Sequence, residues 1–328
     1  MTSVFFGITT RSFSYSHTIG RMEDAGPGFR HPIDLAINQG DLIYVVNRAR
    51  QYRPEGVRIT VCTLGEDYVN EFGSFGEADG QFVWPISIAL DSDGNVYVAD
   101  QWLNRISIFD KDGQFLAKWG VAGTDDGQLN QPFGIAFDRK EHLYVVDSQN
   151  NRIQNFTKDG QFLANWGEAG SGPGQFNLPW GVAVDDKGDV WVADWRNDRI
   201  QKFTADGEFL AEFGSSGSGV GELNRPAGVA IDRRGDIYVA DWGNNRLQVF
   251  TADGRHITTL TGDATLSKWG QAQLELNPDM IRQRNLVSDL KRERRFWNPT
   301  AIAIDPNERI LVADCQRHRI QVYQKHNH

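Results

Sequence analysis

The sequence is poor in the residues that carry disulfide and metal chemistry. Its 328 residues include two cysteines, Cys62 and Cys315, which lie in different repeats and lack the spacing of a metal site. A free cysteine outside such a pattern behaves as a small apolar side chain. We therefore assign the two cysteines no chemistry.

Long hydrophobic runs and excess positive charge are also missing. No stretch of about 18 apolar residues occurs, so we predict no membrane span. The segment from Met1 to Ser12 lacks a basic start and a small-residue cleavage site, which indicates no secretory signal and predicts a cytoplasmic protein. The net charge of -9 disfavours nucleic acid and anionic lipid as partners.

The dominant feature of the sequence is a repeat. The segments VYVAD, LYVVD, VWVAD and IYVAD recur every 47 residues, and ILVAD follows near the C-terminus. Each ends in an aspartate that is followed five residues later by an arginine and preceded by a proline at a fixed distance. A period of this length through most of the chain predicts one closed domain over residues 1–328. The aspartates are Asp100, Asp147, Asp194, Asp241 and Asp314, and the arginines are Arg105, Arg152, Arg199, Arg246 and Arg319.

Each repeat unit is predicted to be a four-stranded meander. GIAFD, LYVVD, RIQNF and FLANW are short β-rich segments of one unit, separated by turn signals such as Asp159-Gly160. Six such units predict an all-β, six-bladed β-propeller, an architecture that leaves few free sheet edges. The units begin near Pro32, Pro85, Pro132, Pro179, Pro226 and Pro299.

The two ends of the chain predict how the ring closes. The last unit stops after RIQVY (319–323) without a fourth strand, whereas SFSYSHTIG (12–20) precedes the first unit and has no unit of its own. We therefore predict that the N-terminal strand completes blade six. Deleting residues 12–20 should then destabilise the whole ring.

These motifs resemble the NHL repeat family. The resemblance rests on P-x-G-[IV]-A, [IV]-[YW]-V-A-D, N-x-R-[IL]-Q-x-F and D-G, as in Pro179 to Gly207 and Pro226 to Gly254, and it extends over residues 12–325. It implies a propeller of four-stranded NHL-type blades. Proteins of this fold include RNA-binding and protein-binding propellers, receptor sensor domains and a zinc-dependent lyase, so the fold alone does not select a function.

Residues that recur in every unit are expected to be structural. The repeated aspartate should accept turn N–H bonds and the repeated arginine should hold the loop. Trp119, Trp166 and Trp191 stand where other units have Phe or Tyr, and we expect them to fill the core. Function should lie where equivalent positions differ.

Two insertions interrupt the repeat. The first expands a loop of blade one to Asn47–Gly56, and the second, about 265–296, precedes blade six. In the second, Asn277, Pro278 and Asp279 form a helix start, which predicts one helix from Pro278 to about Arg295. Met280, Leu286, Val287 and Leu290 would form its apolar stripe. Since blades one and six become neighbours, both insertions should stand over one sector of the channel mouth, as a partly basic lid or a docking ridge.

The loops before each first strand and after each V-A-D segment should open on one side of the ring, which we call the top face. Six of the ten tryptophans fall in these loops, a bias that favours an aromatic surface for a sugar, a flat ligand, a cation or a peptide. The ligand-binding candidates are Trp84, Trp102, Phe133, Trp180, Trp195, Arg196, Trp242, Trp297, Asn298, Arg317 and His318.

Three functions are compatible with such a face. The first is a binding module for a small molecule, peptide or protein. The second is an enzyme, a lyase or hydrolase, with His31 or Asp34 as acid or base and Arg48 or Arg225 stabilising negative charge. The third is RNA binding, for which the basic character of the face is too local.

The histidines argue against a zinc site of the lyase type. Such a site needs about three histidines, and only His31 and His318 map to the top face. We therefore predict no three-histidine zinc site and name no cofactor. Mixed ligation by His31, Asp34 and Asn47 stays a weaker possibility, and the oligomeric state is not predicted.

Overall fold

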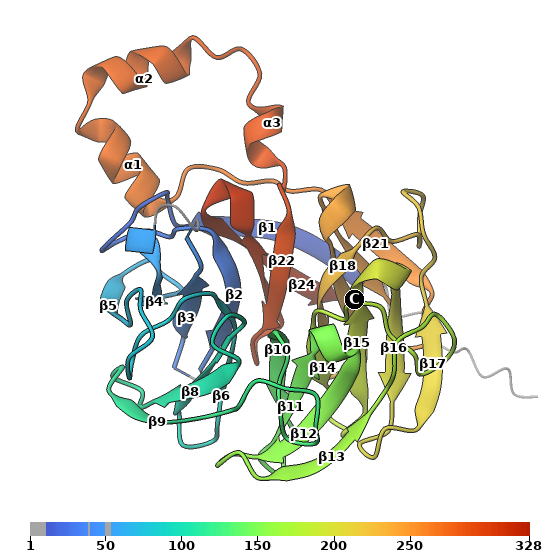
Figure 1. Ribbon diagram of the computed structural model, residues 1–328. Helices are drawn as coiled ribbons and strands as arrows, with labels where there is room; N and C mark the ends of the chain where they lie inside the picture. The colour runs from blue at the N-terminus through green and yellow to red at the C-terminus, as the bar shows by residue number, and fades with distance from the viewer. Residues whose placement is uncertain (1–10, 39, 50–53) are drawn as a thin grey trace, which may run out of the picture.

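A computed structural model describes residues 11–38, 40–49 and 54–328. The signal-peptide prediction for Met1 to Ser12 falls mainly on residues 1–10, and the centre of the blade-one insertion is residues 50–53; both stretches lie outside the described residues. The described chain forms six four-stranded antiparallel sheets arranged as the blades of a ring (Figure 1). The predicted six-bladed propeller is confirmed.

Each sheet uses its strands in chain order from the channel outward, except in the last blade. Blade one comprises β2 (Pro32–Ile37), β3 (Leu42–Asn47), β4 (Arg58–Thr63) and β5 (Tyr68–Phe72). Blade two comprises β6 (Pro85–Leu90), β7 (Val96–Asp100), β8 (Arg105–Phe109) and β9 (Phe115–Trp119). Blade three comprises β10 (Pro132–Phe137), β11 (His142–Asp147), β12 (Arg152–Thr157) and β13 (Phe162–Trp166). Blade four comprises β14 (Val182–Val184), β15 (Val190–Asp194), β16 (Arg199–Phe203) and β17 (Phe209–Phe213); blade five β18 (Pro226–Ile231), β19 (Ile237–Asp241), β20 (Arg246–Phe250) and β21 (His256–Leu260); blade six β22 (Pro299–Ile304), β23 (Arg309–Asp314), β24 (Arg319–Asn327) and β1 (Arg11–Ile19).

Blade six is closed by the N-terminal strand, as the sequence predicts. β1 runs antiparallel to β24 in a register from Arg11 opposite Asn327 to Ile19 opposite Ile320, with one irregularity between Tyr15 and His17. The two ends of the chain therefore share one sheet. The ring is held shut by strand hydrogen bonds as well as by side-chain packing.

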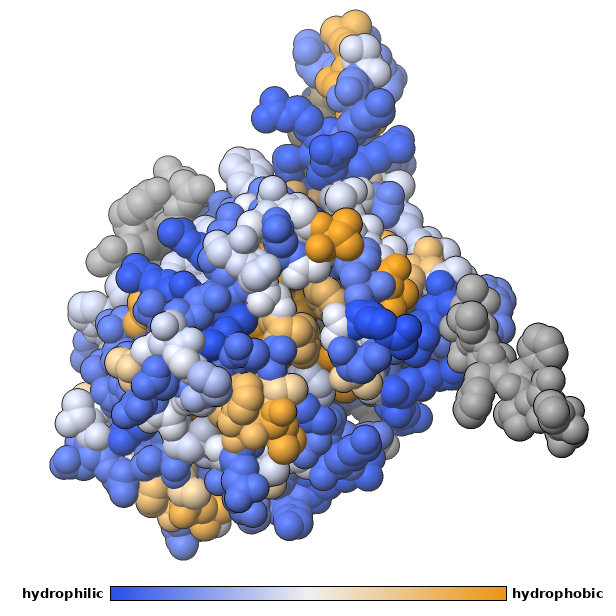
Figure 2. All heavy atoms as spheres, turned by 90° about the vertical axis from the view of Figure 1, so that its right-hand side faces the viewer, coloured by the Kyte–Doolittle hydropathy of each residue, from blue (hydrophilic) through white to orange (hydrophobic). Residues whose placement is uncertain are grey.

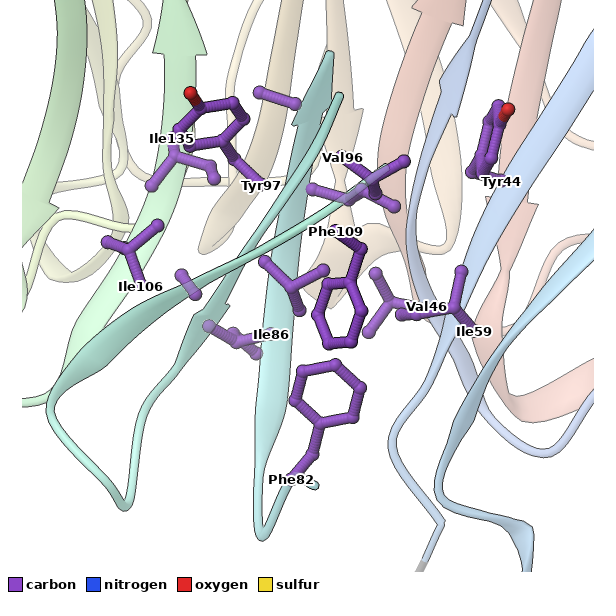
Figure 3. Packing of buried hydrophobic residues seen from close by; sticks show 14 of the residues in the cluster. Tyr44, Val46, Ile59, Phe82, Ile86, Val96, Tyr97, Ile106, Phe109 and Ile135 are labelled. Carbon is purple, nitrogen blue, oxygen red and sulfur yellow. The ribbon is translucent and has the colours of Figure 1, made fainter. Parts of the chain in front are cut away.

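The core lies between adjacent blades, where the buried faces of neighbouring sheets meet. Figure 3 shows Phe82 and Phe109 ring to ring, beside Val46 and Ile59 of blade one, and the centres of the two phenyl rings are 5.5 Å apart. Each fully buried phenylalanine contributes about 1.5–3 kcal/mol of hydrophobic stabilisation. Cys62 and Cys315 are buried free thiols.

The insertion before blade six differs from its prediction. A single helix from Pro278 to about Arg295 is wrong: the segment forms α1 (Lys268–Glu275), α2 (Pro278–Asn285) and α3 (Lys291–Arg294). The start of α2 is as predicted, with the Asn277 side chain accepting backbone N–H bonds at the N-terminus. We call residues 263–297 the arch, because they leave the ring and return to it (Figure 1).

The arch is attached at the rim of the ring. Trp269 of α1 packs edge-on against Phe29, with ring centres 5.9 Å apart, and the backbone N–H of Lys268 donates to Glu66 of blade one. Farther out, Arg284 and Glu293 join α2 to α3 at 2.8 Å. The expected apolar stripe is not buried: Met280, Leu286 and Val287 are exposed on a mostly hydrophilic arch that rises from the propeller (Figure 2). None of the three helices in the described residues is long and apolar enough to cross a membrane.

Candidate functional site

The repeated Asp–Arg pair belongs to the scaffold, as expected from its recurrence. In blade three, Asp147 accepts the backbone N–H of Asn130 at 2.6 Å and the Nε–H of Arg152 at 2.8 Å. Arg152 in turn donates to the carbonyl oxygens of Asp125 and Gln128. The pair ties the loop between two blades to the strand that follows it. It lies buried, with no free group for chemistry.

Asn47 takes the place of this aspartate in blade one. Its Oδ1 accepts the backbone N–H of Arg30 at 2.7 Å, and its Nδ2 donates to the carbonyl of Val45 and to the hydroxyl of Thr60. The amide of Asn47 is therefore used in the same way as the aspartates it replaces. Among the described residues, no group of three or more His, Cys, Asp or Glu side chains is arranged to hold a metal ion.

His31 and His318 meet where blade six joins blade one. His318 has a left-handed backbone (φ 56°), as do Asn151 and Asn245 at the equivalent positions. In those blades the asparagine oxygen accepts the N–H of the residue before the next proline; here Nδ1 of His318 accepts the N–H of His31 at 3.0 Å. The two imidazole rings are 4.4 Å apart. The structure thus brings these two candidates together in an inter-blade contact.

Asp34 lies in the wall of the central channel, a cavity of about 280 Å³ lined by the innermost strands. Its carboxylate accepts hydrogen bonds from the Ser87 hydroxyl at 2.6 Å and from the backbone N–H groups of Ile88 and Leu35 at 3.0 and 2.8 Å. Burial raises the pKa of Asp34 to about 6, and these three hydrogen bonds oppose the rise. The side chain therefore joins blade one to blade two.

Glycine at the equivalent positions explains why a side chain fits here. In blades three to five, a Cβ atom on Gly134, Gly181 or Gly228 would meet a backbone oxygen of the next blade at 2.4–2.7 Å. Those innermost strands touch backbone to backbone, and Gly134 donates directly to the carbonyl of Trp180 at 2.8 Å. At the first two blades, Asp34 and Ser87 bridge the neighbouring strands with their side chains. Ser87 breaks the glycine pattern as Asp34 does, a signal that sequence reasoning missed.

The Asp34 pKa predicts a pH-dependent stability. The folded pKa of about 6 exceeds the ordinary value of 3.8, so the protonated carboxyl stabilises the fold below about pH 4 and this contribution is lost as the pH rises through 6. The difference corresponds to about 3 kcal/mol. We expect the wild type to lose about that much relative to Asp34→Asn between about pH 4 and pH 7, measured by urea unfolding. A difference independent of pH would contradict the assignment.

The top face carries a run of aromatic rings on blades three to five. Phe133 contacts Trp180 with ring centres 4.8 Å apart, Trp180 contacts Trp195 at 5.6 Å, and Trp195 contacts Trp242 at 6.3 Å. All four rings are partly exposed. We call these four residues the aromatic arc. Four of the eleven ligand-binding candidates are thus brought into one surface.

Three more candidates lie on blades one and two. Trp84 and Trp102 meet edge to face at 5.0 Å, and the guanidinium of Arg48 lies over the Trp84 ring at 5.3 Å. Together with Pro54 and Phe75 they line a second cavity of about 260 Å³. Burial lowers the pKa of Arg48, whose Nη2 donates to the Gln101 side chain at 2.7 Å.

Arginines stacked on tryptophans are a common element of this face. Arg225 and Arg196 lie over Trp195, at 4.9 and 5.7 Å from the ring centre, and Arg317 lies over Trp297 at 5.1 Å. Within the described ranges, none of these three arginines or Arg48 makes an ion pair. Most arginines elsewhere in the ring have a carboxylate partner, so these four guanidinium groups differ from them in lacking one.

The catalytic candidates do not form one cluster of contacts. His31 is packed against His318, Asp34 bonds to Ser87, Arg48 lies on Trp84, and Arg225 lies on Trp195 of blade four. Asn298 bridges to blade five, where its backbone N–H donates to Asn245 at 2.8 Å. The geometry of the top face therefore supports binding through rings and guanidinium groups more directly than acid–base chemistry.

Comparison with known proteins identifies NHL repeats in three of the blades. The NHL repeat model matches residues 176–203, 223–250 and 296–323, which lie in blades four to six. Protein lin-41 of Caenorhabditis elegans is 36% identical over 73 residues, and NHL repeat-containing protein 3 of Homo sapiens is 30% identical over 126 residues. The matches cover 22% and 35% of this chain, and only 6% and 35% of those relatives.

Solved structures agree on the fold. A virginiamycin B lyase from Staphylococcus aureus, catalytically inactive and crystallised with quinupristin, superposes with a TM-score of 0.59 at 15% identity, over 95% of this chain and 99% of that one. At this identity the likeness concerns the fold alone. The chain thus carries three NHL repeats within a six-bladed β-propeller, and these repeats are what it shares with its NHL-repeat relatives.

Proposed function

We propose that this propeller is a binding module that holds a small molecule, a peptide or a partner protein on its top face. The observation that carries the proposal is the aromatic arc, a continuous run of ring contacts from Phe133 to Trp242 across three blades. The scaffold does not require it. At the position of Trp195, blades two, three and six have Gln101, Ser148 and Cys315.

The chemistry of the arc suggests the character of the ligand. Partly exposed tryptophans bind flat or apolar groups, and they gain little by contact with water. Arg196 and Arg225 beside Trp195 add positive charge at the same place. A ligand with an apolar or planar part and a negative group matches both features. Trp84 and Trp102 on blade two, and Trp297, Asn298, Arg317 and His318 on blade six, extend this surface around the mouth, beside the partly basic arch.

An enzyme at the same mouth is the second candidate. Its support is Asp34, whose pKa of about 6 suits proton transfer near neutral pH. The carboxylate already accepts three hydrogen bonds, so it would have to exchange one of them for a substrate. Loss of turnover in Asp34→Asn, with ligand affinity retained, would support the enzyme over the binding module.

The binding module can be tested with matched tryptophan variants. Thermal-shift screening of aromatic carboxylates, mononucleotides and short acidic peptides should give ligands that raise the Tm of the wild type. The same ligands should raise the Tm of Trp180→Ala and Trp195→Ala much less, because their affinity for these variants should be lowered at least about tenfold. Trp119→Phe is the control, because Phe72 and Phe213 occupy its position in other blades. Ligands that raise the Tm of both alanine variants as much as that of the wild type would contradict the proposal.

A further inference from the structure

We propose that a cleft at the root of the arch binds an anionic group, a phosphate or a carboxylate, on a planar ring that packs against Trp297. The inference rests on the proposed function, since Trp297 and Arg317 belong to the same top face. It adds the chemical class of the ligand and places its charged group in one cleft.

The cleft lies between blade five and the returning end of the arch. It has a volume of about 430 Å³ and is the largest of the three described cavities. Three arginines line it, and no acidic side chain does. The lining residues are Asn244, Asn245, Thr261, Arg292, Arg295, Phe296, Trp297 and Arg317.

The charged and aromatic lining departs from the repeat at each position. Arg317 stands where blades three to five have Asn150, Asn197 and Asn244, and Trp297 stands where they have Asn130, Asn177 and Asn224. Arg295 replaces the residue that is Gln81, Gln128 and Gln175 in blades two to four.

The regular residues hold the scaffold together. In blade four, for example, Asn197 donates to the carbonyl of Gly170 and to Asp194. In blade six Arg317 donates instead to the carbonyl of Arg292, at 2.7 Å. Since the junctions of blades three to five close without these three side chains, the regular scaffold does not account for them.

The three arginines lack negative partners within the described part of the chain. The two carboxylates that act on Arg317 are engaged elsewhere: Glu293 forms a two-pronged pair with Arg284 at 2.8 and 3.0 Å, and Asp314 pairs with Arg319 at 2.8 Å. Burial, together with the positive charges of Arg319 and Arg292, lowers the pKa of Arg317, and the carboxylates of Asp314 and Glu293 oppose this in part. Cations that repel one another in this way favour an anion between them.

Trp297 supplies the apolar contact. The side chain is 50% exposed although it begins a blade, and Arg317 stacks on its ring at 5.1 Å. The backbone N–H of Trp297 donates to the Asp314 carboxylate at 2.7 Å, which fixes the backbone from which the indole ring projects. A planar group entering the cleft can pack on the indole while its charged end reaches the guanidinium groups.

The test measures binding to the full chain by isothermal titration with four probes: adenosine monophosphate, adenosine, inorganic phosphate and phthalate. At least one of adenosine monophosphate and phthalate should bind, because only these two probes join a planar ring to an anion. The probe that binds should do so at least about tenfold more tightly than adenosine or phosphate alone. Saturation by the nucleotide identifies a phosphate ligand, and saturation by phthalate identifies a carboxylate ligand. No saturation by either overturns the proposal.

Variants that restore the repeat provide the controls. Arg317→Asn, Arg295→Gln and Trp297→Asn introduce the residue of the regular blades, so the fold should be kept, as circular dichroism can check. Each should weaken binding at least about fivefold. Unchanged affinity in all three variants overturns the cleft. Trp119→Phe is the matched control and should leave probe affinity unchanged. Affinity that is lost in Trp195→Ala but kept in all three cleft variants places the probes on the aromatic arc and overturns the cleft alone, whereas no Tm response to any screened ligand overturns the proposed function.

Discussion

A chain that starts at Gly20, without β1, should lose the cooperative unfolding transition of the whole ring. β1 is the fourth strand of blade six, and its removal leaves β24 as an unpaired edge. It also removes the fully buried Ile19 and the contact of Tyr15 with Tyr323, whose ring centres are 5.8 Å apart. Loss of one buried isoleucine alone costs about 2–5 kcal/mol, and a domain of this kind is stable by only about 5–15 kcal/mol.

The effect should reach beyond blade six because the strand joins the two ends of the ring. Circular dichroism melts and amide hydrogen exchange should show lowered protection in blades one and five as well. A synthetic peptide of residues 11–19, added in trans, should restore the transition, whereas a scrambled peptide should not. A truncated chain that melts like the whole one would show that the closing strand only covers an edge.

Replacing Lys325 by methionine should cost about 3–5 kcal/mol. The ammonium group is fully buried, pairs with Asp232, and lies 2.7 Å from Asp236, both on blade five. Without the cation, the carboxylates stay buried with less compensation, which is far more costly than losing a surface pair. Urea unfolding of the variant measures the loss directly.

Two controls separate charge from packing at Lys325. Lys111 occupies the same position of the repeat in blade two, yet it is exposed and pairs with the exposed Asp112. Lys111→Met should leave the stability unchanged within error. In the second control, Asp232→Asn and Asp236→Asn are added to Lys325→Met and should recover much of the loss. If Lys325→Met is as stable as the wild type, the buried ion pair does not hold blades five and six together.

The repeat made the ring predictable from the sequence. Each strand recurs in at least five copies, so an ambiguous segment in one repeat can be interpreted from its counterparts in the others. The SFSYSHTIG segment has no unit of its own, and this predicted that the N-terminal strand closes the ring. The arch has no second copy to compare. Its helix ends at Asn285, and the side chain of Asp289 accepts the backbone N–H of Lys291 at 2.8 Å where α3 begins. α1 depends on Trp269 packing against Phe29, a contact between distant segments that no local pattern contains.

The candidate site was predictable as positions but not as contacts. Departures from the repeat put the tryptophans on the top face, yet which rings touch depends on side-chain rotamers set by neighbouring blades. Arg292 and Arg295 lie in the insertion predicted as a partly basic lid, and the fold of the arch decides that they line the same cleft as Arg317. Asp34 was predicted as an acid, a base or a metal ligand, whereas its hydrogen bond to Ser87 depends on how blades one and two approach each other, which no local pattern contains.

The ten tryptophans allow one direct test of a binding top face. Protein labelled with 5-fluorotryptophan gives one fluorine resonance for each, assignable with single Trp→Phe variants. During titration with the ligands found by thermal shift, all large changes in chemical shift should fall on the six top-face residues, Trp84, Trp102, Trp180, Trp195, Trp242 and Trp297. Trp119, Trp166, Trp191 and Trp269, which fill the scaffold, should stay unchanged. Changes confined to these four, with the six top-face resonances silent, would contradict the account.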